Sequence, residues 1–130
     1  MFFDYERTMR LFNNAPNSHI IKIFFYIVIH QPKDGILGFK IDKKQLQFDL
    51  KLSRTILFDS LHWLKHELFI HELKIGEKYD FMVNPYIIMN DGDRDERIKE
   101  WSRRFKLESE REKRLLKERR RRELKKANQQ

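Results

Sequence analysis

Leucines at helical spacing lie on both sides of a short break in the middle of the chain. Before the break, Leu46 and Leu50 form an i, i+4 pair, and Asp42 is placed to cap the helix that carries them. Gln45, three residues after Asp42, completes the pattern of a reciprocal capping box. This segment therefore predicts a short helix that begins directly after Asp42.

After the break, Leu57, Leu61 and Leu64 fall on one face of a second predicted helix, with Ser53 as its candidate N-cap. The other face carries Arg54, Thr55, Phe58, Asp59 and His62. Two short helices joined by a tight turn are typical of a helix-turn-helix, whose second helix can enter the major groove of DNA.

The segments before these helices predict further elements. Residues 1–17 indicate a short strand that leads into a helical turn and ends in a loop with a proline. Residues 18–31 are apolar almost all round, and their β-branched residues make a buried strand an alternative. The length between Ser18, a candidate N-cap, and Pro32 favours a helix at the centre of the core.

Apolar residues in short runs then predict strands. A turn at 32–38 leads into a strand at 36–41, and residues 69–75 and 79–83 form a hairpin around a tight turn at 76–78. Helix, strand, two helices and a hairpin is the order of a winged helix, with the hairpin as the wing. We therefore predict an α+β fold: a winged helix-turn-helix domain with a long charged C-terminal helix.

The C-terminal helix has its own start signal. Pro85 ends the last strand, and residues 86–89 are predicted to be an apolar linker. Asp93 and Glu96 form a second capping-box pattern, after which a helix can run to about Lys126.

Its first turns are predicted to dock on the domain through a stripe of Ile98, Trp101 and Phe105. The stripe does not continue as a coiled-coil seam, because the later seam positions are charged. Three i, i+4 ion pairs, each worth a few tenths of a kcal/mol, are expected on the helix surface: Glu100–Arg104, Glu110–Arg114 and Glu118–Arg122.

The basic charge is concentrated in this C-terminal segment. The 130 residues have a formal charge of +8, and the residues from Arg94 onward hold sixteen basic and eight acidic side chains, so residues 1–93 are neutral. A hydrophobic content of 40% with eleven Phe is sufficient for one small core. The predicted organisation is a lead-in at 1–17, a DNA-binding domain at 18–92 and a basic helix or tail at 93–130.

The composition also bears on the compartment. The chain has no cysteine, so disulfides and thiolate metal sites are excluded. Its longest apolar run, residues 20–29, contains Lys22 and is too short to span a bilayer, and no charged-then-apolar leader opens the chain. We predict a cytoplasmic protein with no membrane partner.

The stretch LKLSRTILFDSLHWLKHELFI, followed after the hairpin by YDFMVNPYIIMNDGDRDERIKEW, resembles the winged-helix replication initiators of bacterial plasmids. The likeness covers roughly residues 14–101, with a looser match at FFDYERTMRLF. Its most telling part is the Asn-Pro pair at 84–85, followed by an apolar run, Gly92, Arg97 and Trp101. The resemblance implies binding at a plasmid origin to start replication, without the protein itself forming a phosphodiester bond.

Three residues depart from the family's pattern. Lys51 in the turn between the helices and Leu68 at the end of the second helix stand where such proteins commonly carry Gly. A left-handed residue other than Gly costs about 1–2 kcal/mol, so these turns are either shaped differently or strained. Asp59 stands where a basic recognition residue is common, and its charge would repel phosphate.

The start of the second helix is the part that usually reaches base edges. Arg54 can bind a guanine bidentately there, and Thr55, two residues after the cap Ser53, can meet a thymine methyl group. Phe58 and His62 lie one and two turns further on as additional candidates. Packing of Phe58 against the first strand of the domain is an equal alternative.

Four lysines are candidates for phosphate contacts. Lys43 and Lys44 lie at the N-terminus of the first helix, and Lys74 and Lys78 flank the tip of the hairpin. The alternative for all four is an ordinary surface lysine.

The densest basic cluster is in the tail, at Arg119, Arg120, Arg121 and Arg122. The tail has three interpretations: a solvated spacer helix, a phosphate-binding arm, or a docking segment for a replication or transcription protein. The arm is favoured because attraction to a polyanion requires no match of shape.

Metal binding and catalysis have little support in the sequence. His62 and His66 are four residues apart and His71 follows, but a metal would need a further converging ligand such as Glu67 or Glu72. Surface and hairpin-base positions are favoured for these histidines. No phosphate-binding loop, catalytic triad or paired acid and base is recognisable, so we predict no enzyme and no cofactor.

These features predict a sequence-specific protein that binds double-stranded DNA and initiates replication of a plasmid or related mobile element. Host replication proteins are a second class of partner. Two alternatives remain: a small winged-helix transcriptional regulator, and a non-enzymatic winged-helix module that docks a replication protein through the second helix. The oligomeric state, a dimer included, is left open.

Overall fold

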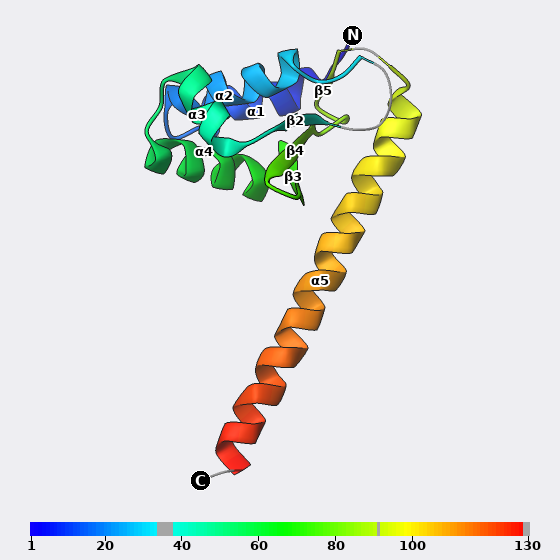
Figure 1. Cartoon of the computed structure of the whole chain (residues 1–130). Helices are drawn as coiled ribbons and strands as arrows, with labels where there is room; N and C mark the ends of the chain where they lie inside the picture. The colour runs from blue at the N-terminus through cyan, green and yellow to red at the C-terminus, as the bar shows by residue number, and fades with distance from the viewer. Residues whose placement is uncertain (34–37, 91, 129–130) are drawn as a thin grey trace.

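The computed structural model describes residues 1–33, 38–90 and 92–128. Its elements are, in order, β1 (Phe2–Phe3), α1 (Tyr5–Asn14), α2 (Ser18–Ile29), β2 (Phe39–Ile41), α3 (Lys43–Leu50), α4 (Arg54–His66), β3 (Ile70–Ile75), β4 (Lys78–Val83), β5 (Ile88–Met89) and α5 (Arg94–Asn128). Figure 1 shows the other elements gathered in one body, from which α5 projects as a long helix. The predicted α+β class is confirmed.

The first seventeen residues form a full helix as well as a strand. α1 spans 10 residues, so the prediction of a single helical turn was too short. Its N-cap is Asp4, whose carboxylate accepts a hydrogen bond from the backbone N–H of Arg7 at 2.8 Å. Leu11 is fully buried in the same core as the later helices, so this segment is part of the body.

The segment predicted as an apolar linker, residues 86–89, contains strand β5. β5 pairs antiparallel with β1, with Met89 opposite Phe2 and Ile88 opposite Phe3. The linker prediction was wrong because β5 is defined by its pairing with β1, more than eighty positions earlier. The pattern of residues 86–89 alone gives no sign of this pairing.

α2 lies at the centre of the core, as its apolar composition predicted. Its buried side chains are Ile20, Ile23, Phe24, Ile27 and Val28. The ring of Phe24 meets the ring of Phe69 edge-on, with 5.6 Å between centroids. The N-cap is Asn17 instead of Ser18, since the Asn17 side-chain oxygen accepts from the backbone N–H groups of the second and third residues after it, at 3.0 and 3.3 Å.

α3 and α4 form the predicted helical pair. Asp42 caps α3 by accepting from Gln45 N at 2.7 Å, and Ser53 caps α4 by accepting from Ile56 N at 3.2 Å. The Gln45 side chain does not return to Asp42 but donates to Asp49 at 2.7 Å, so half of the predicted capping box forms. The three leucines of α4 are buried, and the five residues predicted for its other face are exposed.

The turn after α3 has the hydrogen bonds of a Schellman motif. Leu52 N donates to Gln47 O at 3.2 Å, and Lys51 N donates to Phe48 O at 3.2 Å. Lys51 occupies the left-handed position of this motif with a φ of 54°. Glycine is the usual residue at that position because it has no Cβ.

The turn after α4 repeats this arrangement. Phe69 N donates to Leu64 O at 2.9 Å, Leu68 N donates to Lys65 O at 3.1 Å, and Leu68 has a φ of 63°. The sequence left open whether these turns are shaped differently or are strained. Both turns keep the left-handed conformation that favours glycine, so both are strained.

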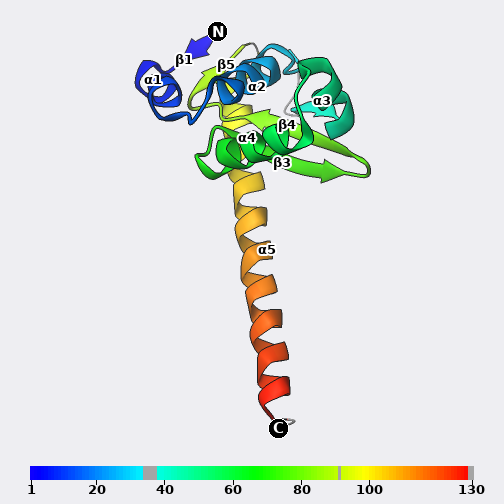
Figure 2. The ribbon, with the colours of Figure 1, turned by 90° about the vertical axis from the view of Figure 1, so that its left-hand side faces the viewer.

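The larger sheet has the strand order β2–β4–β3, with β4 in the middle and both pairings antiparallel. β2 begins at Phe39; the first two residues of its predicted span, 36 and 37, lie outside the described residues. β3 and β4 are joined by Gly76 and Glu77, one residue fewer than predicted, and Gly76 has a φ of 63°. Figure 2 shows the tip of this hairpin on the same side of the body as α3.

The first turns of α5 dock through charged side chains. The buried residues of α5 are Arg97, Glu100, Trp101 and Arg104. Arg104 Nη1 donates to Asp80 Oδ1 at 2.8 Å, and Arg104 Nε donates to Glu100 Oε1 at 2.9 Å. The predicted apolar stripe was right for Trp101 and wrong for Phe105, which is 47% exposed.

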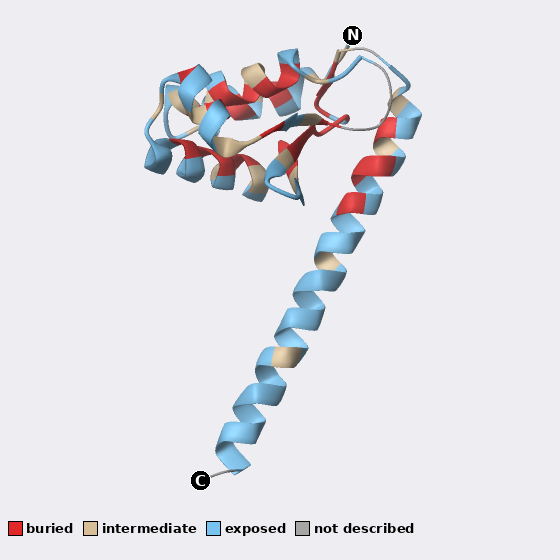
Figure 3. Cartoon of the chain, in the orientation of Figure 1, coloured by how far each residue is buried: buried red, intermediate tan, exposed pale blue. Residues whose placement is uncertain are grey.

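Beyond Arg104 none of the described residues of α5 is buried, so most of the helix stands in solvent (Figure 3). The predicted Glu100–Arg104 pair is confirmed at 2.9 Å. The other two predicted pairs are absent from the ion pairs that the described residues form. No helix in residues 1–33, 38–90 and 92–128 is both long and apolar enough to cross a membrane.

Candidate nucleic-acid interface

An open groove lies where α3, the start of α4 and the β3–β4 hairpin meet. Its lining residues are Asp42, Lys43, Lys44, Gln47, Arg54, Phe58, Glu77, Lys78 and Tyr79. We call it the helix–hairpin groove. Five of these nine residues are candidates from the sequence, and they come from three different elements. The fold therefore brings together in space a set that is spread over more than thirty positions of the chain.

Arg54 is held at the edge of this groove by Phe58. Its guanidinium carbon lies 5.0 Å from the centroid of the Phe58 ring, a cation–π contact worth about 0.5–1 kcal/mol at an exposed site. Arg54 forms no ion pair with the described residues, so its donors remain accessible. Phe58 itself is 36% exposed. Thr55 is exposed beside them, and the Ser53 hydroxyl is occupied as the cap of α4.

Lys43 is turned inward instead of toward solvent. Its Nζ lies 2.7 Å from Glu72 Oε1, 4.1 Å from the centroid of the Tyr79 ring and 4.9 Å from that of Phe58. The contact with Glu72 is an ion pair without a directional hydrogen bond, since Oε1 has no partner at hydrogen-bonding angles. Lys43 therefore joins α3 to the hairpin, while its neighbour Lys44 is exposed.

Glu72 stands between two lysines. Lys65 Nζ lies 2.8 Å from Glu72 Oε2, on the other side from Lys43. Burial on its own would raise the pKa of Glu72, but the two ammonium groups outweigh burial and the pKa is lowered. The carboxylate is therefore charged at neutral pH and ties α3, α4 and β3 together beneath the groove.

Two sequence candidates face α5 instead of the helix–hairpin groove. His62 lines a second hollow, between the end of α4 and α5, and its ring stacks on that of His66 at 6.5 Å between centroids. Lys74 lines a third hollow, between the hairpin and α5. Arg103 and Arg111 also line that third hollow. The structure separates His62 and Lys74 from Arg54.

The four tail arginines lie far from the groove. Arg119 to Arg122 are all exposed in the C-terminal part of α5. Arg119 is fifteen residues beyond Arg104, the last buried residue, which corresponds to about 22 Å of helix at 1.5 Å per residue. The tail cluster and the groove are therefore separate surfaces.

Tyr79, Gln47 and Glu77 line the groove but were not candidates from the sequence. Tyr79 is the most informative of them because its ring lies under the Lys43 ammonium group. Tyr79 stands opposite Ile41 in the β2–β4 pairing, and Ile41 directly precedes the cap of α3. The pairing register places Tyr79 in the groove, and no local pattern around Tyr79 reveals that register.

The three candidate histidines do not converge. His71 is buried on the face of the sheet that α5 covers, 6.3 Å from the Trp101 ring, with its Nε2 3.2 Å from Glu108 Oε2. Burial lowers the pKa of His71, and the nearby charge of Arg104 lowers it further. Glu108 acts in the opposite direction but does not outweigh them, so the pKa lies below its ordinary value. Within the described parts of the chain, no three His, Asp or Glu side chains are grouped as a metal site would require.

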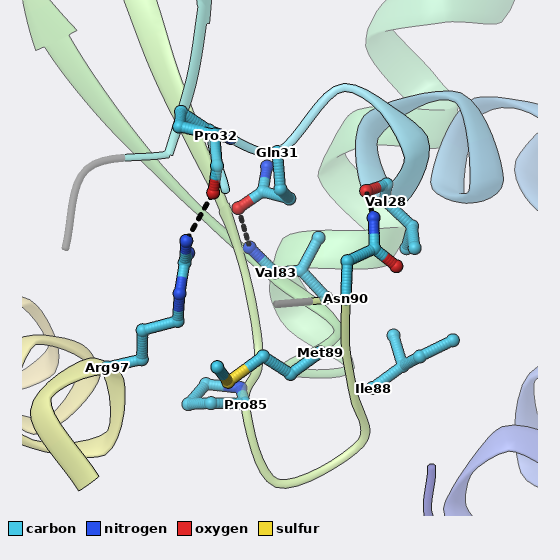
Figure 4. A pocket seen from close by; sticks show the side chains of 9 residues that line it. All are labelled: Val28, Gln31, Pro32, Val83, Pro85, Ile88, Met89, Asn90 and Arg97. Atoms are coloured by element: carbon cyan, nitrogen blue, oxygen red, sulfur yellow. Dashed lines mark hydrogen bonds between the residues drawn. The ribbon is translucent and has the colours of Figure 1, made fainter. Parts of the chain in front are cut away.

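A small cavity lies at the joint between the end of α2 and the start of α5 (Figure 4). The polar side chains around it bind backbone groups: Asn90 donates to Val28 O at 2.6 Å, Gln31 accepts from Val83 N at 3.4 Å, and Arg97 donates to the carbonyl of Pro32. Burial lowers the pKa of Arg97. The contact of Arg97 with Pro32 joins the first turn of α5 to the segment that follows α2.

Comparisons of the chain with protein-family models, with curated proteins and with solved structures found no match. A functional assignment therefore depends on the helix–hairpin groove and on the elements that form it.

Proposed function

We propose that the protein binds double-stranded DNA sequence-specifically as a winged helix, with α4 in the major groove and the β3–β4 hairpin as the wing. The observation that supports this best is the groove itself. It combines an accessible Arg54 at the start of α4 with exposed Lys44 and Lys78 on its two walls. In helix-turn-helix proteins, the first residues of the second helix contact base edges while flanking groups contact the backbone.

Each exposed residue has a role in this proposal. Arg54 donates bidentately to O6 and N7 of a guanine, and Thr55 contacts a thymine methyl group. Lys44 and Lys78 contact phosphates on either side. Lys43 has no direct role, because Glu72 and Tyr79 hold it inside the fold, where it positions α3 against the hairpin.

We further propose that this binding initiates replication of a plasmid or related mobile element. Support comes from the resemblance to plasmid initiators, whose most telling part starts at Asn84. Asn84 is buried, donates to the carbonyl of the strained Leu68 at 2.8 Å and accepts from Tyr86 N at 2.9 Å. The side chain therefore links the end of α4 to the segment that leads into β5. In this role the protein recruits host replication proteins and forms no phosphodiester bond itself.

A second candidate function is a module that docks another protein through α4. The exposed carboxylate of Asp59 on the outward face of α4 and the neutral charge of residues 1–93 favour it. A transcriptional regulator would use the same groove as an initiator and would differ in the DNA site it binds.

Mobility-shift assays with origin and promoter fragments, and with a duplex selected by the protein from a random pool, test the proposal. Arg54→Ala should weaken binding to the selected site by about 1–3 kcal/mol, and much less to random DNA. Lys40→Ala is the control, because Lys40 is an exposed basic residue on β2 outside the groove. Preference for the origin fragment over promoters supports the replication role.

Asp59→Asn separates the two candidate functions. Near a phosphate the Asp59 charge opposes binding, so its removal should tighten DNA association, most at low salt where screening is weak. If both Arg54→Ala and Asp59→Asn leave DNA affinity unchanged, the docking module is the better description of α4.

A further inference from the structure

Four basic residues of α5 follow a seven-residue repeat: Lys99, Lys106, Lys113 and Arg120. Lys117 stands four residues after Lys113, and residues four and seven apart lie on one face of an α-helix. All five side chains are exposed. We call these five residues the basic stripe. Glu110, four residues after Lys106, is an acidic side chain on the same face.

The stripe points away from the body. The residues of α5 that contact the body include Arg97, Trp101, Arg104 and Glu108. Lys99 and Lys106 follow Arg97 and Arg104 by two positions, which corresponds to about 200° around the helix axis. The stripe is therefore on the opposite side of α5 from the sheet.

The side of α5 that faces α4 has a different character. The hollow toward α4 is lined on the α5 side by Phe105, Glu108, Ser109 and Glu112, which include two carboxylates and no basic residue. The side toward the hairpin is mixed, because Arg103, Arg104, Glu108 and Arg111 line that hollow. The residues of the basic stripe lie outside both hollows.

The four tail arginines lie on different faces of α5, and only one of them belongs to the basic stripe. Arg120 belongs to it, whereas Arg119 lies seven residues after Glu112 and Arg122 lies fourteen residues after Glu108. Arg119 and Arg122 therefore continue the sides of α5 that face the body. The four arginines do not act as one cluster on one face.

We propose that the basic stripe binds a second DNA duplex, distinct from the one in the helix–hairpin groove, so that one molecule bridges two DNA segments. The identity of the groove's occupant rests on the function proposed above; the stripe's affinity for a polyanion does not. From Lys99 to Arg120 the stripe extends about 32 Å, close to one turn of B-form DNA. Lysine and arginine bind phosphates by charge without a matched shape, so a straight exposed row is sufficient.

A capture experiment with two duplexes tests the bridge. A duplex selected by the protein is tethered to beads, and a labelled duplex of unrelated sequence is added free in solution with the full-length protein. The stripe variant carries Lys106→Gln, Lys113→Gln, Lys117→Gln and Arg120→Gln. The matched control carries Arg111→Gln, Arg119→Gln, Arg122→Gln and Lys126→Gln, which removes the same charge from the other sides of the same helix. Glutamine has nearly the helix propensity of Lys and Arg, and circular dichroism verifies that α5 is retained.

The wild-type protein and the control should capture the free duplex to within about twofold of each other, and the stripe variant should capture at least about tenfold less. The slope of log affinity against log salt for the unrelated duplex should fall by about 0.9 for each phosphate that the stripe variant no longer neutralises. Equal losses of capture in both variants would show that binding of the free duplex depends on the total charge of α5 and not on the face that carries it. That result would overturn the inference. Full capture by the stripe variant would overturn it too, because bridging would then come from an oligomer with two grooves.

Absence of capture by the wild-type protein would also reject the bridge, in favour of an acidic protein as the occupant of the stripe. Failure of the proposed function has a separate signature. If Arg54→Ala binds the tethered duplex like the wild-type protein, the groove is not the DNA reader. The stripe substitutions, made in that Arg54→Ala background, should still weaken binding to unrelated DNA.

Discussion

Replacing Lys51 with Gly is expected to stabilise the protein. Lys51 has φ 54° and ψ 46° at the end of α3, in the left-handed region where a Cβ meets the following carbonyl oxygen. Its side chain is exposed and forms neither an ion pair nor a side-chain hydrogen bond with the described residues. The substitution therefore removes the strain without removing a favourable side-chain interaction of either kind.

Two opposing terms set the magnitude. A residue other than Gly in the left-handed conformation costs about 1–2 kcal/mol. Glycine offsets part of the gain, because its greater freedom in the unfolded chain costs about 0.4–1 kcal/mol relative to Ala. The net gain is about 0.5–1 kcal/mol, which corresponds to a rise of roughly 2–4 °C in melting temperature for a chain of this size.

Thermal and urea unfolding, followed by circular dichroism, measure the effect. Lys51→Ala is the matched control, because it removes the same side chain and keeps the Cβ that causes the strain. The control should show no gain. If Lys51→Gly melts no higher than Lys51→Ala, the left-handed turn is not a source of strain and the reasoning is refuted. Leu68 is a less suitable site, since it is 45% exposed and its partly buried side chain would be lost with the strain.

Phe24→Ala removes a fully buried ring and should lower the free energy of unfolding by about 3–5 kcal/mol; an unchanged melting temperature would place α2 outside the core. Arg104→Met leaves Asp80 buried without its partner charge and should cost about 3–5 kcal/mol in urea unfolding, and a loss near zero would mean that α5 docks without this pair. Burial lowers the pKa of His71, so the unfolded chain binds this proton first, and stability should fall as the pH drops from about 6.5 toward the lower folded pKa. His71→Gln should flatten that part of the stability curve, and a variant with the wild-type slope would contradict the assignment.

The helices were predictable where their signals are local. Asp42 and Ser53 each cap a helix by binding an N–H three residues away, and the leucines of α4 repeat within one helix. The docking of α5 was not predictable in this way. Arg104 is buried because Asp80, on a strand twenty-four positions earlier, neutralises it, and an apolar period cannot identify a charged pair.

In the candidate site, too, features with a local signal were predictable and features set by long-range contacts were not. Arg54, Lys44 and Lys78 were expected on three neighbouring elements, and the fold places them around one groove. Lys43 was expected to be a phosphate contact or a surface lysine. It is instead held by Glu72 and Tyr79, which the register of the β3–β4 hairpin places beside it. His62 and Lys74 face α5 because of the direction in which α5 leaves the body, which no local pattern around these two residues reveals.

The pairing of β1 with β5 has a consequence for synthesis on the ribosome. Phe2 pairs with Met89, eighty-seven positions later, and the Arg94 guanidinium lies 3.8 Å from the Phe2 ring. At about 5–20 residues per second, the first strand waits roughly 4–17 s for its partner. Helices and hairpins form in microseconds, so α2, α4 and the hairpin can assemble while β1 is still free. β1 is therefore placed later than the elements made directly after it, and during that interval its backbone is open to pairing with other nascent chains.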